Sequence, residues 1–139
     1  CRSRRIRAHP TSGTNKNTGQ AHEPEMPTTP EALAAAEAIN VRALDAIDAV
    51  IAEYELPAHT VGVGVKGCVT WSPTPVRNYR DYKATDFDLA FAQWMHGINR
   101  GILLPPGLDE QWLISVMHDD VASMQYADVF AEFVEQLTG

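Results

Sequence analysis

Three histidines and one carboxylate are the side chains of this 139-residue chain whose positions invite a chemical interpretation. His59, His96 and His118 are too scattered to predict a metal site, which needs three or four ligands at short spacings. None of them has the sequence context of a Ser-His-Asp or Cys-His arrangement. We therefore expect hydrogen-bonding roles. For His118, which directly precedes Asp119, we expect a bond to a backbone group at a helix start or to a carboxylate.

Glu110 is the carboxylate with the more informative surroundings. It follows the rigid turn Pro105-Pro106-Gly107 and precedes a strand-like segment that contains Trp112. A charged side chain after such a turn either caps exposed backbone or points into a cleft, and the spacing alone leaves both interpretations open. Asp109 beside it is expected to face water.

The closely spaced glycines Gly62 and Gly64 could be interpreted as part of a phosphate-binding loop. The segment lacks the third glycine, the Lys-Ser/Thr pair and the following helix of such loops. We therefore favour glycines that permit a close backbone approach or a bulge. Cys68, in the next strand-like run, is interpreted as a small buried apolar residue. Cys1 is the only other cysteine, so the sequence predicts no disulfide framework and a reduced, cytoplasmic setting.

Size and charge limit the class of protein. A chain of this length with 45% apolar residues can form one domain with an ordinary core. The net charge of −7 argues against nucleic acid as the main partner, because phosphate binding needs a basic face. No apolar run approaches the ~20 residues of a membrane-spanning helix, so a membrane is not an expected partner either.

Residues 1–28 differ in composition from the rest of the chain. They contain almost no large apolar side chains, so burial cannot offset the entropy lost on ordering, and we expect them to be disordered. Residues 1–30 carry five basic and two acidic side chains, a net charge of +3, which leaves −10 for the remainder. Nucleic-acid binding by this arginine-rich start is opposed by that remainder. The first residue is Cys rather than Met, which indicates a processed, tagged or truncated product.

Residues 29–139 carry the signals of an α+β domain. Thr29-Pro30-Glu31 predicts a helix start with Thr as N-cap, and Pro57 predicts its end. The period-two segments 59–65 and 67–72 predict two strands. A loop over 73–79 leads to a second helix that starts near Thr85 or Asp86, with Thr85 and Asp88 as a capping box.

The second helix is expected to end at Gly101, followed by short strands at 102–104 and 111–116 and a last helix from about 119–121. This order predicts three helices that cover one face of a mainly antiparallel sheet. The residues expected to face the core are Leu33, Ala36, Leu44, Ile47, Val50, Ile51 and Tyr54, then Phe87, Phe91, Trp94, Met95 and Ile98, then Met124, Ala127, Phe130, Phe133, Val134 and Leu137.

Several short motifs occur in a characteristic order. Pro75-Val-Arg-Asn-Tyr79 precedes the second predicted helix, and Arg100-Gly-Ile-Leu-Leu-Pro-Pro106 follows it. The pattern Pro-Pro-x-x-x-Glu-x-Trp-x-x-Ser-x-x-His then continues through Glu110, Trp112, Ser115 and His118. In this order and spacing, residues 30–139 resemble the C-terminal domain of glutamate-1-semialdehyde 2,1-aminomutase and related class III aminotransferases. These are pyridoxal-phosphate enzymes. In the family a Thr usually follows the His, whereas this sequence has Asp119 at that position. The difference affects only the capping of the last predicted helix.

The resemblance implies the small C-terminal domain of the aspartate-aminotransferase-type fold. It also implies a substrate-positioning role for Glu110, because the matching Glu lies at the substrate entrance in the aminomutase branch. Other class III aminotransferases use a C-terminal arginine to bind a substrate carboxylate. No arginine follows Arg100 here, which favours the aminomutase branch. A small amino-acid-like substrate and a homodimer are implied for the full enzyme.

Pyridoxal phosphate is the cofactor that the resemblance implies for the full enzyme, and its Schiff-base lysine and pyridine-pairing Asp belong to the family's large domain. That domain is the partner this chain lacks, so no catalytic residue is expected here. Lys16, Lys66 and Lys83 do not stand in the family's context and are interpreted as solvated charges. Ser12-Gly13-Thr14 is similar to the family's phosphate-contacting Gly-Thr turn, which makes Thr14 a candidate cofactor contact. In the family this turn is followed by Asn-Pro and an alanine-rich helix, but residues 15–22 of this sequence have neither.

Two functions remain open. In the first, the chain is a C-terminal fragment of a pyridoxal-phosphate aminotransferase or aminomutase, inactive alone, with residues 1–28 translated out of frame in a truncated or frame-shifted gene. In the second, residues 29–139 are a free-standing, non-catalytic α/β module that binds a partner and exposes no large apolar face. A melting curve with a hydrophobic dye would distinguish them, and sequencing of the upstream DNA would test the frame shift.

Overall fold

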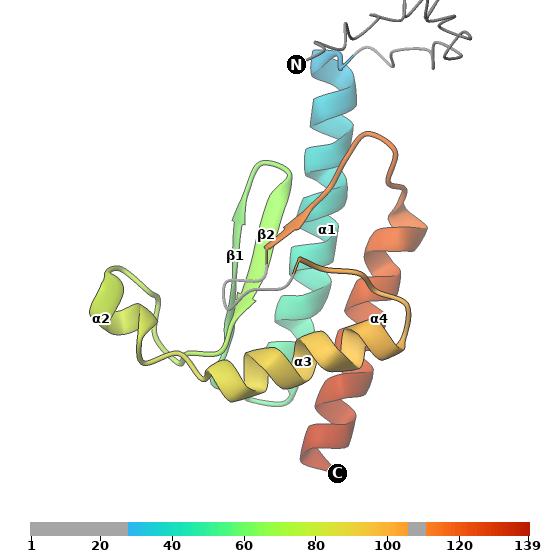
Figure 1. Ribbon diagram of the computed structural model, residues 1–139. Helices are drawn as coiled ribbons and strands as arrows, with labels where there is room; N and C mark the ends of the chain where they lie inside the picture. The colour runs from blue at the N-terminus through green and yellow to red at the C-terminus, as the bar shows by residue number, and fades with distance from the viewer. Residues whose placement is uncertain (1–27, 106–110) are drawn as a thin grey trace, which may run out of the picture.

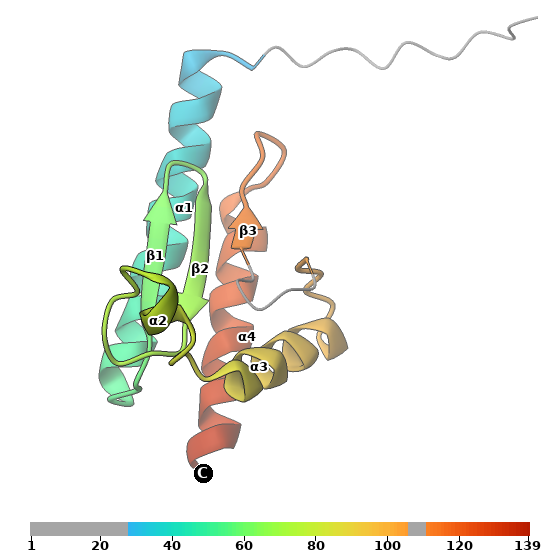
Figure 2. The same cartoon turned by 60° about the vertical axis from the view of Figure 1, so that its left-hand side comes forward.

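A three-stranded sheet with two long helices on one side forms the centre of the molecule in the computed structural model, which describes residues 28–105 and 111–139 (Figure 1). In chain order the elements are α1 (Pro30–Glu53), β1 (His59–Val63), β2 (Lys66–Thr70), α2 (Tyr79–Tyr82), α3 (Phe87–Asn99), β3 (Gln111–Leu113) and α4 (Asp120–Thr138). Both views show α1 and α4 on one face of the sheet and α2 standing away from the other (Figures 1 and 2). The predicted fold class is therefore confirmed. In the described ranges, no helix combines the length and apolar character of a membrane span.

The start of α1 follows the sequence signals, but its end does not extend to Pro57. The Thr29 hydroxyl accepts a hydrogen bond from the Ala32 amide at 3.2 Å. Hydrogen bonding of the Glu31 carboxylate to its own backbone amide, and then to the Thr29 side chain, lowers the pKa of Glu31. The helix ends at Glu53, well before Pro57. Ile47 and Ile51 are buried as predicted, whereas Leu33 is exposed.

The strands pair in the order β1-β2-β3, and both pairings are antiparallel. Val61 lies opposite Cys68, and Cys68 opposite Gln111, so these side chains share the outer face of the sheet, away from α1. The alternate positions face α1, where Gly62 lies against Leu44. The predicted close backbone approach is therefore confirmed at Gly62. Cys68 is half-buried on the outer face, so the prediction that it is buried is wrong.

The predicted capping and core face of α3 need correction. Asp86, not Thr85, caps the helix by accepting the Leu89 amide at 3.0 Å. The small residues Ala90 and Gly97 are buried, together with a half-buried Gln93, while the predicted core residues Phe91 and Met95 are exposed. A helix presents small residues where it packs closely, and the position of Gln93 follows from its hydrogen bonds described below.

The segment 102–104 is not a strand, contrary to the prediction. Gly101 adopts the left-handed conformation (φ 83°), and the Ile102 amide donates to the Gly97 carbonyl at 2.9 Å. The Leu104 carbonyl accepts the Trp94 indole N–H at 3.1 Å. These bonds tie the segment to the end of α3. The predicted strand 111–116 is shorter than expected, and the short helix α2 was not predicted.

The C-terminal helix begins as the sequence indicates. Asp119 is its N-cap and accepts the Ala122 amide at 2.9 Å. Phe130 and Val134 are almost fully buried, and both pack in the core with Trp71 at the end of β2. Met124 and Leu137, also predicted to be in the core, are exposed.

The substitution of Gly67 by alanine tests the close contact between β2 and β3. In Gly67→Ala, the new Cβ would lie 2.3 Å from Cζ2 of the Trp112 ring, which cannot rotate away without losing its hydrogen bond to Asn40. We expect a loss of about 1–3 kcal/mol in the free energy of unfolding, measured by urea denaturation. Gly62→Ala is the matched control, because its Cβ meets only a terminal methyl of the flexible Leu44 side chain. Equal stability of the two variants would contradict the packing described.

Candidate functional site

Asn40 joins three elements in the interior. It lies in the middle of α1 with only 1% of its surface exposed. Its amide nitrogen donates to the carbonyl oxygens of Gly64 and Lys66, at 2.8 and 2.9 Å, on either side of the β1–β2 turn. Its carbonyl oxygen accepts the indole N–H of Trp112 in β3 at 2.7 Å. One side chain therefore fixes the hairpin and β3 relative to α1.

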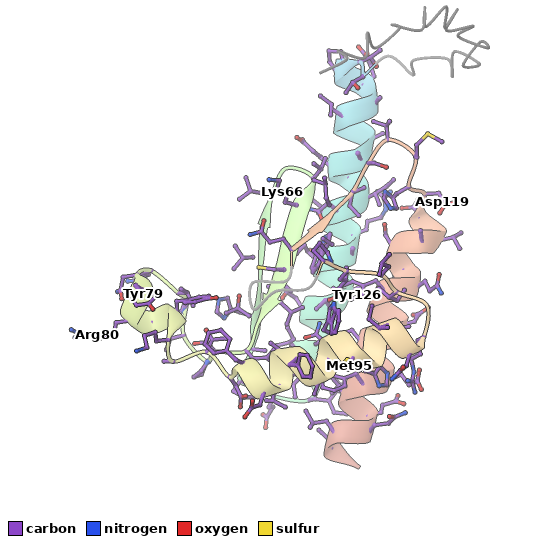
Figure 3. All side chains as sticks on the ribbon, in the orientation of Figure 1. Lys66, Tyr79, Arg80, Met95, Asp119 and Tyr126 are labelled. Atoms are coloured by element: carbon purple, nitrogen blue, oxygen red, sulfur yellow. The ribbon has the colours of Figure 1, made fainter. Side chains whose placement is uncertain are left out.

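A second set of hydrogen bonds joins the end of β2 to α3 and α4. The Trp71 indole donates to Gln93 Oε1 at 2.7 Å, and Gln93 Nε2 donates to the Tyr126 hydroxyl at 2.8 Å. The Tyr126 ring lies 5.2 Å from the Trp112 ring, centroid to centroid. Figure 3 shows Tyr126 on α4 directed toward the space between α3 and β3. The contact between Tyr126 and Trp112 thus links this group of hydrogen bonds to the bonds made by Asn40.

Trp112 and Tyr126 also line a cavity beside β3 with a volume of about 440 Å³. Its other walls are the segment 101–105 and the first half of α4, and its lining is mainly apolar. The polar side chains that reach it are those of Gln111, His118, Ser123 and Gln125. A cavity of this kind suits a small molecule or part of one, or a side chain from another protein surface.

Ser115 and His118, the last two residues of the motif, are in contact. The His118 Nδ1 atom accepts the Ser115 amide at 2.9 Å and lies 2.9 Å from the Ser115 hydroxyl. The His118 amide in turn donates to the Ser115 carbonyl at 3.0 Å. The predicted bond from His118 to a helix-start group or carboxylate is therefore wrong, because the ring is used to close the turn between β3 and α4.

Arg100, the first residue of the second motif, anchors α3 to α4. Its guanidinium binds both carboxylate oxygens of Glu132, with Nε 2.6 Å from Oε2. These hydrogen bonds lower the pKa of Glu132 and raise that of Arg100. The adjacent His96 ring packs edge-on against Phe133, and its Nε2 is buried without a hydrogen bond. Burial, and then the Arg100 charge, lower the pKa of His96, while Glu132 acts in the opposite direction.

Some of the predicted site residues lie outside the described ranges, and the others are exposed lysines. Glu110, Thr14 and Lys16 lie outside the described residues. Lys66 is exposed at the start of β2, and Lys83 is exposed at the end of α2. Within the described ranges, no group of three or more metal-binding side chains comes together.

Asn40, Gln93 and Gly67 were not predicted, although the sequence contains a signal for one of them. An asparagine is a poor helix former, and Asn40 follows an alanine-rich stretch four residues after the buried Ala36. Its position therefore indicates a buried hydrogen-bonding role. Gln93 carries no such signal, because glutamine is common in exposed helical positions.

Comparison with solved structures finds the same fold in known enzymes. No family model matches the chain. The K286A variant of a glutamate-1-semialdehyde aminomutase from Pseudomonas aeruginosa PAO1, in complex with PMP, has a TM-score of 0.73 and 17% identity over 78% of this chain and 24% of its own. A second structure of that aminomutase gives 0.72, with the same identity and coverage. A transaminase with PLP bound gives 0.62 and 19% identity over 79% of this chain and 24% of its own.

The chain shares its fold with these enzymes. It spans about a quarter of the length of each of them. At these levels of identity, the likeness shows the fold. The fold that the motif resemblance predicted is therefore confirmed.

Removal of the Asn40 amide tests its role. In Asn40→Ala, two backbone carbonyls and the Trp112 N–H lose their partners in the interior. We expect the free energy of unfolding to fall by about 1–3 kcal/mol, with a red shift in tryptophan fluorescence. Asn99→Ala at the exposed end of α3 is the control and should have little effect. A stability for Asn40→Ala within error of that control would contradict the role assigned.

The environment of His96 predicts a pH dependence of stability. Because its pKa is lowered in the folded state, the unfolded chain binds the proton more readily, and protonation favours unfolding. The stability that depends on neutral His96 is present above its ordinary pKa of 6.5 and is lost as the pH falls below that value. His96→Gln should therefore reduce the change in melting temperature between about pH 7 and pH 5. The same pH dependence in variant and parent would refute this assignment.

Proposed function

We propose that this chain is the C-terminal segment of a pyridoxal-phosphate-dependent aminotransferase or aminomutase of the glutamate-1-semialdehyde 2,1-aminomutase kind. In this proposal the whole enzyme is a cytoplasmic homodimer that transfers an amino group on a small amino-acid-like substrate. Residues 29–139 are its small domain, beside the substrate entrance. The main support is that two independent likenesses agree: the order of the motifs along the sequence, and the fold shared with an aminomutase and a transaminase.

The outer face of the sheet gives further support. Val63 and Leu113 are 76% and 58% exposed on this face, and Val61 beside them is 45% exposed. The long helices α1 and α4 lie on the opposite face of the sheet (Figures 1 and 2). Neighbouring apolar side chains on an open sheet face are typical of a surface that another domain covers. A covering large domain is therefore part of the proposal, and the free-standing module, which should lack such a face, is disfavoured.

The motif residues have defined roles in the proposed enzyme. Glu110 directly precedes β3 and is the proposed substrate-positioning carboxylate. Trp112, two residues later, is held by Asn40, and Ser115 and His118 close the turn at the other end of the strand. The chain thus contributes a fixed strand beside the entrance, and the group that reacts with the amino substrate is supplied by the large domain.

The described residues do not by themselves fit pyridoxal phosphate. The cofactor needs a lysine in an enclosed site and a carboxylate for its pyridine nitrogen. Lys66 lines a hollow of about 300 Å³ on the outer face with Val61, Val63, Cys68 and Gln111, and none of the described residues that line it is a carboxylate. Lys83 lies on the exposed α2. When bound in the whole enzyme, the cofactor supplies the electron sink for amino transfer.

The proposal predicts that the isolated chain does not bind pyridoxal phosphate covalently. After incubation with an equimolar amount of cofactor and reduction with borohydride, the intact mass should be unchanged, because exposed lysines lack an enclosing site. Lys66→Arg and Lys83→Arg would identify any lysine that reacts. A stoichiometric reduced adduct on Lys16, Lys66 or Lys83, or turnover of an amino donor by the chain alone, would contradict the predicted inactivity.

The DNA upstream of the coding sequence tests the proposal as a whole. We expect a region that encodes a pyridoxal-phosphate-binding domain with its lysine in another reading frame. Residues 1–28 would then be an out-of-frame segment. Upstream DNA unrelated to such a domain would count against the proposal.

A further inference from the structure

In the described ranges, no strand lies beside the edge of β3 that faces away from β2, here called the free edge. The Ile114 amide donates to the Val65 carbonyl at 2.8 Å, and along an antiparallel strand the residues that bond to the neighbouring strand alternate with those that do not. The backbone groups of Gln111 and Leu113 therefore point away from β2. They meet no backbone partner in the part of the chain that the structure describes.

The cavity of about 440 Å³ described above borders the free edge. Residues 111–114 all line it, although alternate side chains of a strand point to opposite faces of a sheet. A space that four consecutive residues line therefore lies along the edge of the strand. The opposite wall is the segment 101–105, which Figure 2 shows on the side of β3 away from β2. The cavity thus separates two stretches of backbone.

The wall opposite β3 also presents backbone groups. The Ile102 amide and the Leu104 carbonyl are already bonded to α3. The amide and the carbonyl of Leu103, between them, have no partner among the described residues, and the Leu103 side chain is 87% exposed. Backbone N–H and C=O groups that are removed from water need hydrogen-bond partners. A ligand that fills the cavity therefore has to supply donors and acceptors to both walls.

The remaining walls of the cavity favour an uncharged occupant. Ala122, Ser123 and Tyr126 of α4 line it together with Ala43 of α1. No Asp, Glu, Lys or Arg is among the described residues that line the cavity. Because the burial of a charge without a partner is costly, a charged side chain is disfavoured in this space. Apolar or small uncharged side chains fit it.

We propose that the cavity receives an extended, uncharged peptide segment of another protein, which adds to β3 as a further strand of the sheet. The added strand runs antiparallel to β3, as the two existing pairs of strands do. Its N–H and C=O groups bond to Gln111 and Leu113, and its apolar side chains enter the cavity beside Trp112 and Tyr126. This mode of recognition needs an open strand edge with an adjoining pocket. The proposal rests on this geometry and is independent of the proposed enzymatic function.

Titration of the full 139-residue chain with a synthetic peptide tests this proposal. The probe is the uncharged peptide acetyl-Ser-Val-Thr-Val-Thr-Val-Ser-amide, whose valines and threonines favour strands. We expect saturable binding in isothermal titration calorimetry. The same peptide with N-methyl groups on both threonines keeps every side chain but loses the N–H donors that face the free edge, because cross-strand partners share one face and the valines enter the cavity. Its affinity should be lower by about tenfold or more.

Two variants of the chain test the same contacts from the other side. Leu113→Pro removes an N–H that does not bond to β2, a change that an edge strand tolerates, and should lower the affinity by about tenfold or more. Leu113→Ala is its control, because it keeps the N–H and should bind as the parent chain does. Ala122→Phe, at an exposed position of α4, places a ring in the cavity and should lower the affinity by a similar factor. Val121→Phe is its control, because Val121 is exposed and does not line the cavity.

Circular dichroism checks that each variant is folded. If Leu113→Pro does not fold, the N-methylated peptide and Ala122→Phe decide. Equal affinities of the plain and the N-methylated peptide would overturn the proposal, because apolar contacts alone would then hold the ligand. So would a plain peptide that does not bind, or binding that a folded Ala122→Phe leaves unchanged.

Discussion

The Asn40 side chain sets the arrangement on which the rest of the fold depends. An amide in the apolar interior is costly unless all its groups are bonded, and Asn40 uses both amide hydrogens and its carbonyl oxygen. Its three partners belong to the β1–β2 turn and to β3. A rotation or shift of α1 would break all three bonds together. The register between helix and sheet is therefore held by directional bonds, whereas apolar packing alone would permit sliding.

This constraint extends through Trp112 to the candidate site. The indole lies against Gly67, where a Cβ atom would be 2.3 Å from the ring, and it also contacts Tyr126. Tyr126 is joined through Gln93 to Trp71 at the far end of β2. Trp112 and Tyr126, which both line the cavity beside β3, are thus each held by a side-chain hydrogen bond. A wall held in this way is suited to presenting the residues that flank β3 in a fixed position, as the proposed enzymatic role requires.

Local signals predicted the elements well, and long-range contacts decided what was missed. Thr29, Asp119 and Gly101 mark helix ends through groups only a few residues apart, so the sequence contains what is needed to place them. The face of α3 that is buried depends on partners in β2 and α4, which no local pattern reveals. The extended conformation of 102–104 looked like a strand, but its backbone is bonded to α3. The resemblance in motif order predicted the shared fold, whereas the role proposed for Glu110 remains a prediction.

A double-mutant cycle between Asn40 and Trp112 measures the central interaction directly. Asn40→Ala removes the acceptor, Trp112→Phe removes the indole donor, and the double variant removes both. If the bond couples α1 to β3 as described, the two losses in the free energy of unfolding should not add, with a coupling energy of about 1–2 kcal/mol. Additive losses within error would show that the two residues act independently and would contradict the account of how this fold is held together.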